Sequence, residues 1–164
     1  MLNEAEQKKA WEGQFMSEVR ALYFAELAAE RYRFQQLLTG LTLLFSSSAA
    51  GVVVLRDASL INPMAAPILF LLVAVVSVLS QNRRLAIDAS DLHSKWNKLA
   101  LDFARLWEDM YSGGARESLW ALEDKAAEYS KSGIPVAPFD SQRMNKWQSH
   151  VEMLHCCIIP ALKP

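Results

Sequence analysis

The chain has 164 residues and a formal net charge of −1, and 52% of its residues are hydrophobic. This length allows one membrane unit and one modest cytosolic extension, and we expect no second globular domain. Lys and Arg (17) balance Asp and Glu (18). The whole chain therefore lacks the basic excess of a typical nucleic-acid-binding protein.

The first segment, residues 1–33, is predicted to be a cytosolic amphipathic helix. Two rows of apolar residues recur at helical spacing from about residue 3 to residue 36. Trp11, Phe15, Val19 and Leu22 form the first row, and Met16, Tyr23, Leu27 and Phe34 form the second.

Two uncharged apolar stretches follow, at 34–55 and 58–82, and only Arg56 and Asp57 interrupt them. Each is long enough to cross a hydrocarbon core of about 30 Å as a helix. We predict a transmembrane hairpin at 34–82, with spans at about 34–55 and 64–82. The alternative is a buried helical pair in a bundle.

Positive charges lie outside the two predicted spans, at Arg31 and Arg33 before the first and at Arg83 and Arg84 after the second. Lys and Arg near a span resist translocation. The predicted localisation is therefore the bacterial inner membrane, as a multi-pass protein with both termini in the cytoplasm.

A heptad seam follows the second span, in the predicted cytosolic segment 83–111. Its apolar residues alternate steps of four and three: Leu85, Ala89, Leu92, Trp96, Leu99, Phe103, Leu106 and Met110. The same spacing of apolar residues continues towards the N-terminus into the second predicted span, which predicts one continuous helix over about 64–111. Its partner is the N-terminal helix of the same chain, the same helix of neighbouring copies, or both.

The last segment, 112–164, is predicted to be a helical cap. Gly113 and Gly114 break the long helix, and a further helix is predicted at about 115–130. After a proline-containing loop, Asp140 or Ser141 caps a last helix that ends near Cys157. The predicted fold is all-α: a two-transmembrane hairpin with an amphipathic N-terminal helix and a long cytosolic helical extension, in an oligomeric bundle.

Polar residues share one face of the first predicted span, and these pore-lining candidates are Gln35, Thr39, Thr42 and Ser46. Such a face can line a weakly selective conduit in an oligomer. Alternatively, the hydroxyls bond to carbonyl groups one turn back or hold helices together. Ser47 and Gly51 are helix-packing candidates, together with the seam residues Leu92, Trp96, Leu99, Phe103 and Leu106.

A ligand site is a second possibility along the seam. Trp96 with Lys98 and Arg105 are ligand-binding candidates, because an aromatic ring can stack on a nucleobase while a cation holds a phosphate. The simpler interpretation makes the tryptophans core anchors.

Enzymatic activity is not expected. His93, His150 and His155 lie in no known catalytic motif. Three consecutive helical residues, His155 to Cys157, point about 100° apart and do not easily share one metal ion. We expect no cofactor and no metal, although a small membrane enzyme that uses Cys156 remains an alternative.

Two segments next to the predicted spans carry a resemblance to a known family. They are Ala28-Ala29-Glu30-Arg31-Tyr32-Arg33 before the first span and Asp91-Leu92-His93-Ser94-Lys95-Trp96-Asn97-Lys98-Leu99 after the second. The layout resembles the SLATT-like two-transmembrane effectors of bacterial nucleotide-signalled anti-phage defence systems. The resemblance covers about residues 21–110, and 115–164 are additional. It implies assembly in the inner membrane and a trigger that is a nucleotide, an oligonucleotide or a separate sensor or nucleotidyltransferase protein.

The expected function is therefore an oligomeric inner-membrane effector that forms pores or disrupts the membrane, gated by a cytosolic nucleotide signal or partner, in anti-phage defence. The expected partners are the lipid bilayer and other copies of the chain. The alternative function is a non-conducting membrane scaffold that anchors a cytosolic partner.

Overall fold

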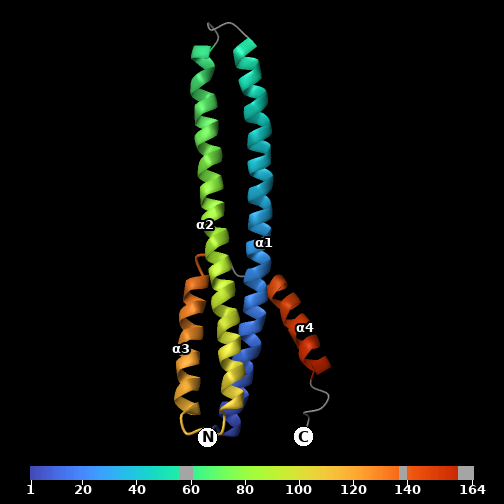
Figure 1. Ribbon diagram of the computed structural model, residues 1–164, viewed down its shortest axis with the longest axis vertical. Helices are drawn as coiled ribbons and strands as arrows, with labels where there is room; N and C mark the ends of the chain where they lie inside the picture. The colour runs from blue at the N-terminus through green and yellow to red at the C-terminus, as the bar shows by residue number, and fades with distance from the viewer. Residues whose placement is uncertain (56–60, 137–139, 159–164) are drawn as a thin grey trace. The chain divides into compact units, whose positions relative to one another are not determined.

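The chain is helical over the residues that this computed structural model describes, which are 1–55, 61–136 and 140–158, with side chains described outside 41–73, 77, 157 and 158. The elements are α1 (Glu4–Leu55), α2 (Ile61–Glu108), α3 (Ala115–Gly133) and α4 (Ser141–Ile158) (Figure 1). Among the described residues there is no strand. The prediction of an all-α helical bundle is confirmed.

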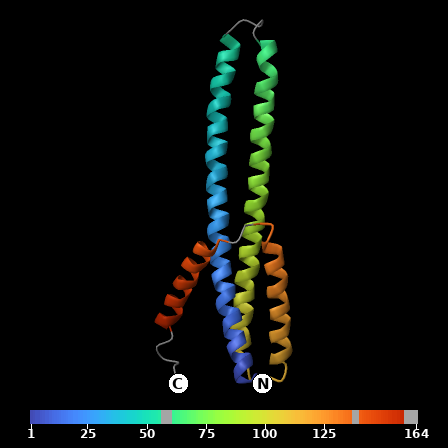
Figure 2. The same cartoon turned by 180° about the vertical axis from the view of Figure 1, so that it is seen from behind.

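Two units share these helices. Unit 1 contains Met1–Leu27 and Asp88–Pro164, and unit 2 contains Ala28–Ile87. In unit 2, the second half of α1 and the first half of α2 run side by side in opposite directions, as both views show (Figures 1 and 2). The long helix predicted at about 64–111 is present as α2.

The seam of α2 forms the core of unit 1. Its residues from Ala89 to Leu106 that follow the heptad rhythm are all buried, and Trp96, Leu99 and Phe103 are almost completely enclosed. The first segment of α1 covers this seam, and α3 adds the buried Leu119. Of the two partners that the heptad pattern allowed, the structure therefore has the N-terminal helix of the same chain on the seam.

A stripe of small residues lets α1 approach α2 closely. Ala10, Gly13, Ser17 and Ala21 follow one another at steps of three, four and four, so they share one face of α1. A Cβ atom added at Gly13 would lie only 2.6 Å from Cζ of Phe103. Glycine is required here because the phenyl ring occupies the space of a side chain.

The beginning of α1 is fixed by a capping box. The side chain of Asn3 accepts a hydrogen bond from N–H of Glu6 (2.8 Å), and Glu6 accepts one from N–H of Asn3 (2.8 Å). Glu6 also pairs with Arg116 at the start of α3, at 2.6 Å. These bonds keep the pKa of Glu6 below its usual value, through the Asn3 backbone first and Arg116 second.

Helix α4 packs against α1 as well. Asp140 Oδ1 accepts a hydrogen bond from N–H of Arg143 (3.1 Å), so the predicted cap is present. A small cluster joins the two helices: its buried members are Phe15, Val19 and Val151, and Leu22, Met144 and Trp147 pack around them. The first predicted row of α1 therefore faces α4.

The predicted localisation in the inner membrane, as a multi-pass protein with both termini in the cytoplasm, is contradicted. Over the residues that the structure describes, no helix offers a stretch both long enough and apolar enough to cross a bilayer. Charged side chains interrupt the described parts of both long helices, at Arg31 and Arg33 in α1 and at Arg83 and Arg84 in α2.

Candidate functional site

The predicted pore-lining stripe is described only at its beginning. Gln35 is half-buried and Thr39 is exposed. Thr39 Oγ1 donates a hydrogen bond to the carbonyl oxygen of Gln35 at 2.9 Å, which is the bond to the preceding turn that the alternative interpretation proposed. The side chains of the other candidates on this span, Thr42, Ser46, Ser47 and Gly51, lie outside the described residues.

Unit 2 presents large apolar side chains to solvent. Six of its described residues have at least half of their surface exposed in the single chain: Tyr32, Phe34 and Leu37 on α1, and Val76, Val78 and Ile87 on α2. Large apolar side chains exposed to this extent are candidates for contact with another molecule.

These exposed residues do not share one face. Val76 and Val78 are two positions apart, so their side chains point about 200° apart around α2. Ile87 returns to the direction of Val76, because eleven residues make just over three whole turns. The exposed apolar side chains of unit 2 therefore point to more than one side of the helix.

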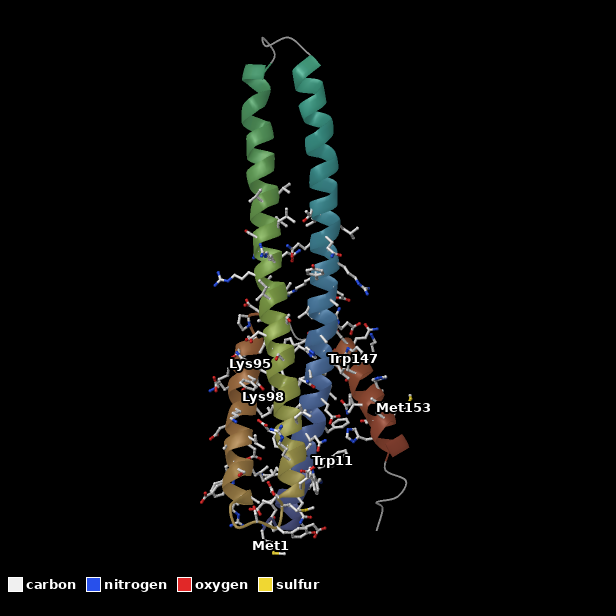
Figure 3. All side chains as sticks on the ribbon, in the orientation of Figure 1. Met1, Trp11, Lys95, Lys98, Trp147 and Met153 are labelled. Atoms are coloured by element: carbon white, nitrogen blue, oxygen red, sulfur yellow. The ribbon has the colours of Figure 1, made fainter. Side chains whose placement is uncertain are left out.

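The predicted ligand-binding residues are not brought together. Trp96 is buried in unit 1, whereas Lys98 and Arg105 are exposed on α2. Arg105 pairs with Asp102 at 3.4 Å on the same helix. Figure 3 labels Lys95 and Lys98, which both extend from the α2 segment of unit 1.

A different cation contacts Trp96. The guanidinium carbon of Arg20 lies 4.6 Å from the centre of the Trp96 ring. Arg20 Nη1 donates a hydrogen bond to Ser130 Oγ at 2.5 Å, and the Tyr129 ring meets Trp96 edge-on at 5.8 Å between ring centres. Burial lowers the pKa of Arg20, because removal of water disfavours its charged form. Helices α1, α2 and α3 each contribute to this cluster.

Helix α4 is held on α1 by two carboxylates. Glu26 accepts hydrogen bonds from Lys146 Nζ at 2.7 Å and from Trp147 Nε1 at 2.5 Å. These donors, Lys146 first, lower the pKa of Glu26. Glu18 lies 2.8 Å from His155 Nε2. In Figure 3, Trp147 lies on the side of α4 that faces α1, whereas Met153 points away from it.

His93 and Cys156 differ in their surroundings. His93 Nδ1 lies 2.8 Å from the carbonyl oxygen of Ala21, so this nitrogen carries the proton and donates it. Cys156 is an exposed free thiol. In the part of the chain that the structure describes, no three His, Cys, Asp or Glu residues gather as metal ligands.

Sequence reasoning missed the interhelical roles of Arg20, Glu18 and Glu26. All three lie on α1 among the apolar rows, and a charged residue within such a row is a signal that a partner faces it. The identity of each partner required the structure, because Ser130, Lys146 and His155 are more than one hundred residues further along the chain.

Comparisons of the chain with protein-family models, with curated proteins and with solved structures found no match.

Proposed function

We propose that the protein is a non-catalytic helical assembly protein, whose unit 2 hairpins associate with other copies of the same chain. The exposure of large apolar side chains on more than one side of unit 2 carries this proposal. Burial of these side chains against a neighbouring molecule removes apolar surface from water, which favours association.

The distribution of these residues favours several copies over one pair. A pair of hairpins covers one patch on each partner, whereas Val76 and Val78 point in nearly opposite directions. A ring or bundle gives each hairpin two neighbours, and closed assemblies of this kind are common among homo-oligomers.

The effector role in anti-phage defence that the resemblance implies is retained as a hypothesis about what the assembly does, with a nucleotide signal or a sensor protein as its trigger. The location in the inner membrane is not retained, and neither is the pore that depended on it. The alternative is a scaffold in which a different protein covers unit 2.

The test measures the mass of the purified full chain by sedimentation velocity over a hundredfold range of concentration. Wild type is expected to sediment as a defined oligomer. Ile87→Asn places a polar amide on the apolar surface of unit 2 and is expected to shift the population towards monomer, because a buried amide without a partner is costly.

The matched control is Leu101→Asn on the same helix. Leu101 is 53% exposed and Ile87 is 58% exposed, but Leu101 belongs to unit 1. The control is expected to assemble like wild type. A monomeric wild type, or an equal loss of mass in both variants, would overturn the proposal. A monomer that co-sediments with phospholipid vesicles would show that lipid, and not another copy, covers these side chains.

A further inference from the structure

The indole N–H of Trp96 is a buried donor without an acceptor. Trp96 is 1% exposed, and Nε1 has no hydrogen-bond partner among the described residues. An indole nitrogen can only donate a hydrogen bond, so the missing group is an acceptor. Buried N–H groups in native proteins nearly always have one, which makes this exception informative.

The guanidinium group of Arg20 lies over the same ring and has no acidic partner among the described residues. No carboxylate of the described residues forms an ion pair with it, and its one hydrogen bond goes to a neutral hydroxyl, Ser130 Oγ. That hydroxyl already donates its own proton to the carbonyl oxygen of Ala126 at 2.7 Å. The guanidinium group of Arg20 therefore keeps several N–H donors without an anionic acceptor.

We propose that Arg20 and Trp96 form a binding site for an oxyanion, which is a carboxylate or a phosphate group of a small ligand. Both side chains offer donors only, so the complementary group accepts hydrogen bonds and carries negative charge. The planar fork of a guanidinium group matches either oxyanion with two parallel bonds. The guanidinium carbon of Arg20 lies 4.6 Å from the centre of the Trp96 ring, so both groups of donors belong to one side-chain cluster.

The two donor groups differ in their access to solvent. Trp96 Nε1 is closed to solvent, whereas Arg20 is half-buried and has a long flexible side chain. Because Trp96 Nε1 has no surface open to solvent, side chains around it must move before an oxyanion can accept its hydrogen bond. Tyr129 of α3 forms one wall, at 5.8 Å from Trp96 between ring centres.

This site does not depend on the proposed assembly, because its residues lie in unit 1 and the assembly surface lies in unit 2. Failure of one is therefore distinguishable from failure of the other: the mass of the particle reports on assembly, and the signal of one indole proton reports on binding.

The test follows the five indole N–H signals of the full chain, labelled with ¹⁵N, by nuclear magnetic resonance. Trp96→Phe identifies the Trp96 signal by its loss. Sodium phosphate and sodium acetate are added in separate titrations, with sodium chloride at equal ionic strength as the reference. The Trp96 signal is expected to move in a saturable way with phosphate, with acetate or with both, and the two arms identify which oxyanion the site prefers.

Two variants of Arg20 and one control complete the test. Arg20→Gln removes the charge and is expected to weaken binding at least tenfold. Arg20→Lys keeps the charge but loses the fork, so it is expected to weaken binding by less than Gln does. Arg105→Gln, at an exposed arginine of α2, is expected to bind like wild type.

Absence of a saturable Trp96 shift with both anions would overturn the proposal, and so would an equal shift with chloride. Unchanged affinity in Arg20→Gln would overturn it as well. Should Arg20→Gln fail to fold, Arg20→Lys alone decides, since wild-type affinity in that variant contradicts recognition by the guanidinium fork.

Discussion

Replacement of Gly13 by alanine tests the close approach of α1 to α2. The added Cβ would lie 2.6 and 2.7 Å from two atoms of the Phe103 ring and 3.1 Å from a third. Ordinary contact begins at 3.4 Å, so the ring or the helix must move by about 0.8 Å (3.4 minus 2.6) to restore it. Phe103 is enclosed by the core of unit 1 and has little room for such a movement.

Two effects of opposite sign contribute to the result. Alanine is a better helix former than glycine, by about 0.8–1.0 kcal/mol in a helix interior. Overpacking of a well-filled core costs about 1–3 kcal/mol. The expected net effect of Gly13→Ala is a loss of about 1 kcal/mol in the free energy of unfolding, or a fall of about 2–4 °C in Tm for a chain of this size.

A double-mutant cycle with Phe103→Leu separates these effects. Leucine has no counterpart of Cζ, Cε1 and Cε2, the three ring atoms that crowd position 13. In the Phe103→Leu background, Gly13→Ala is therefore expected to stabilise unit 1 by about 1 kcal/mol, since only the helix preference remains. The coupling energy of the cycle is expected to be about 1–3 kcal/mol.

Tryptophan fluorescence during urea unfolding suits this measurement. All five tryptophans, Trp11, Trp96, Trp107, Trp120 and Trp147, lie in unit 1. The signal therefore reports on the unit that contains both substitutions. A coupling energy near zero, or a stabilising Gly13→Ala in the wild-type background, would refute the reasoning from close contact.

The remaining predictions concern the carboxylates of Glu6 and Glu26 and the hydroxyl of Thr39. Because the pKa values of Glu6 and Glu26 are lower in the folded chain than their usual 4.5, their contribution to stability is complete above that pH and is lost as the pH falls through the lowered values. The urea midpoint is expected to fall between pH 6 and pH 3, and to fall less in the E6Q/E26Q variant; an equal fall in both proteins would contradict this assignment. Thr39→Val is expected to leave the sedimentation mass unchanged, because the Thr39 hydroxyl bonds to its own helix, and dissociation of the variant would instead place that hydroxyl against a neighbouring molecule.

Local sequence patterns predicted the helices well. The glycine pair before α3, the cap at Asp140 and the heptad rhythm of α2 each act over a few residues, so the sequence displays them directly. The heptad rhythm also requires a partner helix, but it carries no information about which one. The choice of α1 depends on the fit of the Phe103 ring over Gly13, which only the structure reveals.

The candidate sites were less accessible to sequence reasoning. The sequence predicts a site of Trp96 with the nearby Lys98 and Arg105, whereas the cation that contacts Trp96 is Arg20 of another helix. Proximity along a helix misled because residues two positions apart point in nearly opposite directions. The predicted membrane location was based on apolar length at 34–55 and 64–82, and the described residues supply no segment of that kind.

The division of unit 1 between the two ends of the chain has a consequence for its synthesis. The segment Met1–Leu27 is translated before its partners on α2, α3 and α4, which follow only after the whole of Ala28–Ile87. Both apolar rows of the nascent α1 are therefore uncovered during that interval. We expect this segment to engage a holding chaperone during translation and to be released as the last two helices emerge.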